Sequence, residues 1–152
     1  MVLATYPVKL PFPDLSFDAV LSSGVLEHVE DPPGSLAEIH RVLKPNGHFF
    51  VFMLPNKYSY IEFISDRLGR GDHPDKYSKR EIRRRLEKAG FEIREIGYRG
   101  FLPYNLKGFP SIAGKIYHKF DAIAEKIDRV LSALPVINTL STNIEIVSRK
   151  MQ

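Results

Sequence analysis

Apolar residues are distributed along the chain in two ways, in short runs of strand length and in repeats of helical spacing. A run at Phe17–Ser23 that ends in small polar residues predicts a buried parallel strand that opens onto a loop, and His48–Leu54 predicts a second buried strand. Apolar and polar residues alternate over Phe91–Tyr98, which predicts a third strand. We expect a final strand at Asn143–Ser148 and a short first one at Val2–Thr5.

A helix is predicted between the first two long strands. Ser35 and Glu38 have the spacing of a capping box, in which two side chains satisfy free backbone N–H groups at a helix start. Lys44–Gly47 contains a cation, a proline and a glycine, which are typical of a helix end. We expect Leu36, Ile39, Val42 and Leu43 on the apolar side of this helix and Glu38, His40 and Arg41 on its exposed side.

Three further helices are predicted downstream. Tyr58–Leu68 is one, Ser78–Ala89 is a basic helix closed by Gly90, and residues 112–134 form a long amphipathic helix that stops at Pro135. The apolar faces consist of Ile82, Leu86 and Ala89 in the basic helix, and of Ile112, Ile116, Phe120, Ile123, Ile127, Val130, Leu131 and Leu134 in the long helix.

The order of these elements specifies the fold class. Strands that alternate with helices predict an α/β fold with a mainly parallel sheet. The length of 152 residues and 43% hydrophobic content fit a single globular domain, 1–152. The absence of cysteine excludes disulfides, thiolate metal sites and cysteine nucleophiles, and favours a cytoplasmic location. The longest apolar run, Phe49–Pro55, is too short for a transmembrane segment.

The charge of the chain is basic, with a formal net charge of +4. Helical spacing places most basic residues of the Ser78–Ala89 helix opposite its apolar face, which favours a solvated surface over an anionic partner. Basic balance alone indicates no nucleic-acid partner, and we expect none that is specific. The residues concerned are Lys79, Arg80, Arg83, Arg84, Arg85 and Lys88.

Four linked motifs cover residues 10–56. They are a Leu10-Pro-Phe turn, a Phe17-Asp-Ala-Val strand, a Leu26-Glu-His-Val loop and a helix end that reads Glu38-Ile-His-Arg-Val-Leu-Lys-Pro-Asn-Gly47. In this order and spacing the chain resembles class I S-adenosylmethionine-dependent methyltransferases of the small-molecule and quinone-pathway type. The resemblance is strongest over 10–56 and continues in element order to the end.

The resemblance implies a partial Rossmann-like sheet flanked by helices. The four long predicted strands would be the family's strands four to seven, the last one antiparallel. Residues 57–135 would hold the substrate-side helices and strand six, and 143–149 the last strand. The family's glycine-rich turn and ribose-binding acid would precede Met1, and Gly69-Arg-Gly71 follows no predicted strand and so cannot replace the turn. We therefore interpret the chain as the carboxyl-terminal portion of such an enzyme.

The same resemblance implies cofactor-binding residues. The loop after a parallel strand's carboxyl end is where open α/β sheets bind ligands. In the family this loop lines the pocket for S-adenosylmethionine, which assigns Ser22, Ser23, Gly24 and Val25 to it, together with Leu10. A plain structural loop is the alternative. Tyr6 stands where the family usually has an acid that binds the adenine amino group, so this contact departs from the pattern.

Glu27 and His28 are the catalytic candidates, because they are the acid and the imidazole of this loop. His28 is a candidate general base toward a hydroxyl group of a small-molecule acceptor, and a hydrogen-bonded structural histidine is the alternative. Some quinone-pathway relatives bind a divalent cation through Glu-x-x-Glu-His. Here Gly24 replaces the first Glu, and two ligands are too few for a hard cation, so we predict no metal site.

Three interpretations stay open at this point. Aromatic residues of the substrate-side segments line an acceptor pocket or, as we favour, pack in the core. Strand four would expose an apolar edge that invites self-association, unless Val2–Thr5 pairs with this edge and seals it. Alternatively, the chain is a non-catalytic module that docks an anionic membrane surface or an acidic partner through its basic helices. The aromatic residues are Tyr58, Tyr60, Tyr77, Tyr98, Phe101, Tyr104 and Phe109, and Lys115, Lys119 and Lys126 lie opposite the apolar face of the long helix.

Overall fold

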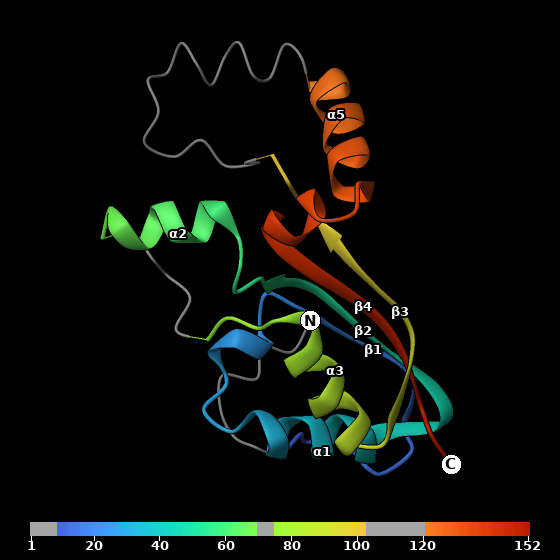
Figure 1. Cartoon of the computed structure of the whole chain (residues 1–152). Coiled ribbons are helices and arrows are strands. Elements are labelled where there is room, and N and C mark those ends of the chain that lie inside the picture. Colours follow the sequence, from blue (N-terminus) through green and yellow to red (C-terminus); the bar gives the residue numbers. More distant parts are fainter. Residues whose placement is uncertain (1–8, 70–74, 103–120) are drawn as a thin grey trace.

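The computed structural model describes residues 9–69, 75–102 and 121–152. Four strands form one mixed sheet in the order β1-β2-β4-β3 (Figure 1). β1 (Phe17–Ser23) pairs in parallel with β2 (Leu43–Pro55), while β4 (Asn143–Lys150) lies antiparallel between β2 and β3 (Phe91–Arg99). The α/β class, the four long strands and the antiparallel last strand are confirmed. The predicted strand Val2–Thr5 lies outside the described residues.

Two irregularities explain how the strands keep their apolar residues on one side. In β3 the pairing register shifts between Ile93 and Glu95, so Ile93 and Ile96 both contact the core although three positions separate them. In β2 a shift accompanies Met53, whose φ is 57°, and it keeps Leu54 buried. A plain alternation of period two would have turned these residues to the opposite face.

The first helix, α1 (Pro32–Val42), starts earlier than predicted. Asp31 is its N-cap and accepts a hydrogen bond from the Gly34 N–H over 3.0 Å, and Pro32 takes the first helical position, where its missing N–H costs nothing. The predicted Ser35 capping box is therefore wrong. The helix ends at Val42, and β2 begins at the next residue.

The third helix, α3 (Lys79–Lys88), confirms its prediction closely. Ser78 and Glu81 form a complete capping box, and Gly90 follows the helix with a φ of 86°. Ile82 and Leu86 are fully buried, while the basic residues face outward. Its amphipathic pattern thus placed this helix correctly.

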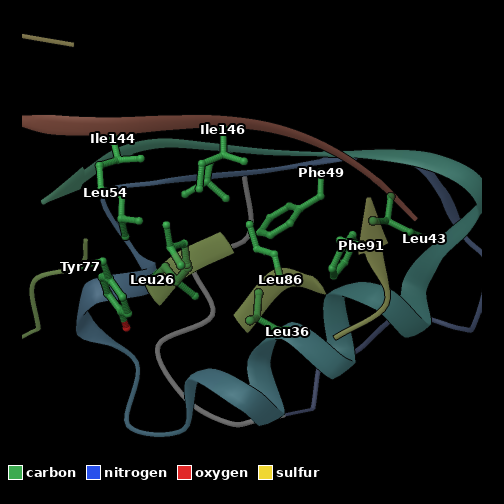
Figure 2. Close-up of a cluster of buried hydrophobic side chains, with 12 residues drawn as sticks. Leu26, Leu36, Leu43, Phe49, Leu54, Tyr77, Leu86, Phe91, Ile144 and Ile146 are labelled. Carbon is green, nitrogen blue, oxygen red and sulfur yellow. The ribbon is translucent and has the colours of Figure 1, made fainter. Parts of the chain in front are cut away.

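The core lies between the sheet and the helices α1 and α3. Figure 2 shows Phe49, Leu54 and Ile146 projecting from the strands toward Leu36 of α1 and Leu86 of α3. Each of these five residues is at most 1% exposed. Burial of each such side chain contributes about 1.5–3 kcal/mol, so this layer is the main source of stability.

The opposite side of the sheet is different, and β1 is not the buried strand that we predicted. In the described part of the chain β1 pairs only with β2, and Leu21 is 60% exposed. The rings of Phe50 and Phe52 lie on the same side, with centroids 6.2 Å apart. Within the described residues β1 is an edge strand, and the exposure of this edge in the whole chain stays a prediction.

The remaining elements gather at one end of the sheet (Figure 1). They are α2 (Tyr60–Arg67), α5 (Asp121–Ala133) and the short helix η2 (Ile137–Leu140), and a further short helix, η1 (Leu26–His28), follows β1. No helix among the described residues is long and apolar enough to cross a membrane. The predicted helix at 112–134 is described from Asp121 onward.

The orientation of α5 differs from the expectation for a surface helix. Ile127 and Val130 of its apolar face are 48% and 60% exposed, whereas Asp128 is 6% exposed and accepts a hydrogen bond from the Leu102 N–H over 2.7 Å. A polar contact to a preceding segment therefore decides which side of α5 is enclosed. Hydrophobic periodicity gave no indication of this contact.

Candidate functional site at the carboxyl end of β1

The loop after β1 starts at the carboxyl end of a parallel strand. Ser22 is buried within the strand, Ser23 is exposed, and Val25 is 49% exposed. Gly24 adopts a φ of 61°, and its N–H donates to the Phe52 carbonyl oxygen over 3.1 Å before the chain leaves the sheet. The chain thus presents Ser23, Gly24 and Val25 at the ligand-binding end of the sheet.

The next turn, η1, separates the two predicted catalytic side chains. Leu26 is buried in the core, and the His28 N–H donates to the Val25 carbonyl oxygen over 2.9 Å. The Glu27 side chain is 2% exposed, whereas that of His28 is 48% exposed, and Glu27 Oε1 lies 4.0 Å from His28 Nε2. The imidazole can therefore meet a molecule from solution directly, and the carboxyl group can act only through its neighbours.

Tyr77 lies near enough to Glu27 for the negative charge of the carboxyl group to act on its hydroxyl. Burial raises the pKa of the Tyr77 hydroxyl; the positive charge of Arg85 opposes this, and the negative charge of Glu27 adds to it. The Arg85 guanidinium lies 5.1 Å from the centre of the Tyr77 ring. Among the described residues, neither the Tyr77 hydroxyl nor Glu27 Oε2 has a hydrogen-bond partner. Two polar groups thus stay unpaired beside the candidate site.

Leu10 lies at the other end of β1 and does not join this loop. Its N–H donates to Glu38 Oε2 over 2.8 Å, and its carbonyl oxygen accepts from Arg41 over 3.1 Å, next to the start of the strand. A strand of seven residues spans about 20 Å, which separates Leu10 from Ser22–Val25. The structure therefore brings together four of the five predicted cofactor-binding residues.

Arg41 uses all five of its N–H donors in this contact. It donates two hydrogen bonds to Glu38, at 2.7 and 2.8 Å, one each to Phe12 O and Leu10 O, and one to Asp14 at 2.6 Å. The hydrogen bonds from Arg41 lower the pKa of Glu38 to about 2 against the opposing effect of burial. The side chains of Arg41 and Glu38 are 23% and 16% exposed, so their predicted exposed position is wrong.

The substrate-side aromatic residues do not share one environment. Tyr77 and Tyr98 pack against the core, which confirms the core interpretation for these two. The Tyr60 hydroxyl donates to the Phe101 carbonyl oxygen over 2.8 Å, whereas Tyr58 is 57% exposed. Tyr104 and Phe109 lie outside the described residues, as does Tyr6.

Comparisons with known proteins decide the family of this chain. A methyltransferase domain family matches residues 2–51. A probable S-adenosylmethionine-dependent methyltransferase of Mycolicibacterium smegmatis is 34% identical over 87 residues, and a demethylmenaquinone methyltransferase of Symbiobacterium thermophilum is 42% identical over 57 residues. These matches support a class I S-adenosylmethionine-dependent methyltransferase, the family that the motifs at residues 10–56 predict. The predicted family is thus confirmed, and S-adenosylmethionine is the cofactor of this family.

A solved structure supports the same fold. An S-adenosylmethionine-dependent methyltransferase from Thermotoga maritima superposes with a TM-score of 0.62 at 20% identity, covering 94% of this chain and 60% of that one. The matched segments cover 57% and 37% of this chain, but only 33% and 23% of the Mycolicibacterium and Symbiobacterium proteins. The chain therefore spans about a third or less of these two relatives.

The described residues fit only part of an S-adenosylmethionine site. Gly24 suits close approach of a ligand, because a Cβ atom built there meets nothing nearer than Glu27 Oε1 at 3.8 Å. Gly69, of the one Gly-x-Gly sequence, follows helix α2 and not a strand. Among the described residues, no group of three or more His, Asp or Glu could hold a metal ion. Among the described residues, the loop after β1 therefore offers at most one side of an S-adenosylmethionine site.

Proposed function

We propose that this chain provides the strand-four loop and acceptor-side part of a methyltransferase that acts on a small-molecule acceptor in the cytoplasm. The observation that carries the proposal is the loop Ser22–His28, which stands at the carboxyl end of β1 with Gly24 in a left-handed conformation. Ser22, Ser23, Gly24 and Val25 are assigned to the cofactor wall. Leu10 is left out of this wall because of its position at the opposite end of the strand.

His28 is the proposed general base, and Glu27 is a positioning residue. The accessible imidazole suits removal of a proton from an acceptor hydroxyl group, and the enclosed carboxyl group at 4.0 Å favours one orientation of the ring. The sulfonium of S-adenosylmethionine already makes the methyl group electrophilic. Alignment and exclusion of water are what the protein would add.

The chain alone is expected to be weak or inactive, because the described residues form one wall of the cofactor pocket. Isothermal titration of this chain with S-adenosylmethionine should detect no binding in the micromolar range. The variant His28→Ala, titrated in parallel, should behave identically. Micromolar affinity of the unmodified chain would contradict this part of the proposal.

Self-association through β1 is a second part of the proposal. The edge of β1 and the exposed Leu21 offer backbone pairing and apolar contact to another copy of the chain. Size-exclusion chromatography should show a dimer or larger species, and Leu21→Lys should shift it toward the monomer. A clean monomer at high micromolar concentration would argue against pairing through this edge.

One observation favours the alternative, a non-catalytic module that docks an anionic membrane. Helix α5 exposes Ile127 and Val130 next to the exposed cations Lys126 and Arg129. Cosedimentation with phosphatidylserine vesicles at moderate salt separates the two functions. The methyltransferase proposal expects no dependence on anionic lipid, whereas binding that Ile127→Glu abolishes would support the alternative.

A further inference from the structure

A groove of about 560 Å³ runs between α1 and α3, and none of its described lining residues belongs to the loop Ser22–His28. Pro33, Leu36 and Ala37 of α1 form one side of its apolar floor, and Ala89 at the end of α3 forms the other. Leu36 is 1% exposed, whereas Ala37 is exposed, so the floor rises from the core to the surface. Concave apolar surfaces of this kind between two helices accept the apolar face of a third helix.

The rim of the groove is positively charged and uncompensated. Arg85 and Lys88 line it, and its described lining residues include no acidic side chain. Among the described residues neither cation has an ion-pair partner, in contrast to Arg83, which lies 3.7 Å from Glu87. Burial and the nearby charge of Lys150 lower the pKa of His40, the remaining polar residue of the described lining, which favours its neutral form.

We propose that this groove binds an amphipathic helix of a partner protein whose apolar stripe is flanked by acidic residues. The apolar floor would take the stripe, while Arg85 and Lys88 would pair with the acidic flanks. The stack of the Arg85 guanidinium over the Tyr77 ring holds one of these cations in place before binding.

Other anionic partners fit the groove less well. A membrane surface is flat and meets protruding apolar side chains, but here the apolar residues line a concave floor. Nucleic acids bind through several phosphate contacts, and single strands also stack on exposed aromatic rings. Two charged cations and a floor without aromatic residues do not provide these contacts.

The test uses a fluorescein-labelled peptide of about 18 residues with a leucine stripe flanked by glutamates, at about 0.15 M salt. The control peptide has the same amino-acid composition in scrambled order. Fluorescence anisotropy with the full chain should give a Kd of tens of micromolar for the striped peptide, and binding of the scrambled peptide should be about tenfold weaker or more. Thermal melting checks that every variant is folded.

Three variants separate a groove from general attraction of charge. Arg85→Glu/Lys88→Glu should weaken binding of the striped peptide about tenfold. The control Arg80→Glu/Arg84→Glu makes the same change of net charge outside the groove, and it should weaken binding less than about twofold. Ala37→Arg should weaken binding although it adds a positive charge, because it fills the floor. If the Arg85 and Lys88 reversals melt early, Arg85→Gln/Lys88→Gln replaces them.

Several outcomes would overturn the proposal. Three results would show that binding rests on nonspecific attraction between charges. They are equal binding of the scrambled peptide, tighter binding by Ala37→Arg, and equal effects of the two double variants. Absence of binding at about 0.5 mM peptide would exclude it. If phosphatidylserine vesicles or duplex DNA bind with the same dependence on Ala37 and Lys88, the partner class is wrong. None of these variants changes a residue of the loop Ser22–His28, so the peptide titration and the cofactor titration test the two proposals separately.

Discussion

The two ends of β1 differ in whether the polar side chains beside them have hydrogen-bond partners. At the amino end, Arg41 directs all five N–H donors to Glu38, Asp14 and two backbone carbonyl oxygens. At the carboxyl end, the Tyr77 hydroxyl and one Glu27 oxygen are enclosed without a hydrogen-bond partner in the described part of the chain. Buried polar groups without a partner destabilise a fold, so the carboxyl end carries a cost that the amino end does not.

This difference suggests separate roles for the two ends of the strand: the amino end anchors a loop, and the carboxyl end holds the candidate site. The amino end fixes the loop at residues 10–16 to α1, because Arg41 and Val42 also accept from the N–H groups of Leu15 and Ser16 at 3.0 and 2.7 Å. The carboxyl end holds the candidate site, where unsatisfied polar groups are a recurrent feature of proteins. The following predictions test the contrast.

The largest effect is expected from Arg41→Ala. This change leaves the Glu38 carboxylate and the carbonyl oxygens of Leu10 and Phe12 without their donor, so the melting temperature should fall on the order of 10 °C. The matched control is Arg84→Ala on the exposed face of α3, which should shift it by about 2 °C or less. Circular dichroism melting measures both, and equal shifts would refute the anchoring role.

The second prediction concerns acid. The pKa of Glu38 is lowered from 4.5 to about 2 in the folded protein, so its stabilisation is complete above pH 4.5 and is lost as the pH falls toward 2. Glu38→Gln cannot ionise and lacks this dependence. Urea unfolding between pH 7 and pH 3 should show a difference between wild type and Glu38→Gln that is constant above pH 5 and shrinks below pH 4.5. A difference unchanged at pH 3 would contradict the assignment.

The smallest effects are expected from single hydroxyl groups. Tyr77→Phe removes a buried hydroxyl that has no described partner, so the free energy of unfolding should stay equal or rise by up to about 1 kcal/mol. Ser148→Ala removes an equally buried hydroxyl that donates to the Phe49 carbonyl oxygen over 2.9 Å, and should cost about 1 kcal/mol. Urea titration of the two variants compares them, and a larger loss for Tyr77→Phe would show that its hydroxyl is paired in solution.

Local sequence patterns correctly predicted those helices and strands whose formation depends mainly on residues close together in the chain. The basic helix was predicted to within a residue, because its apolar spacing and the closing Gly90 are local signals, and the Ser78–Glu81 capping box that the structure shows is local as well. The start of α1 was missed, since Asp31 and Ser35 are both acceptable caps and only the chain path from η1 selects Asp31. The motif that identified the family also located the loop at Ser22–His28 correctly.

Long-range contacts account for the rest of the differences. Spacing alone put Glu38 and Arg41 on a solvated face, but the loop at 10–14, about 30 positions away in the chain, folds over them. The same applies to Asp128, which α5 turns inward toward Leu102. The groove between α1 and α3 also depends on lining residues from two helices that lie more than 40 positions apart in the chain, such as His40 and Arg85.

The sequence by itself determined the α/β class, the long strands, the family and the residues of the candidate loop, because periodicity, caps and linked motifs are properties of neighbouring residues. Only the tertiary structure decided that Glu27 is enclosed while His28 is accessible, and that Leu10 lies at the opposite end of β1 from its predicted partners. Burial and pairing depend on which distant segments meet, and no local pattern records that.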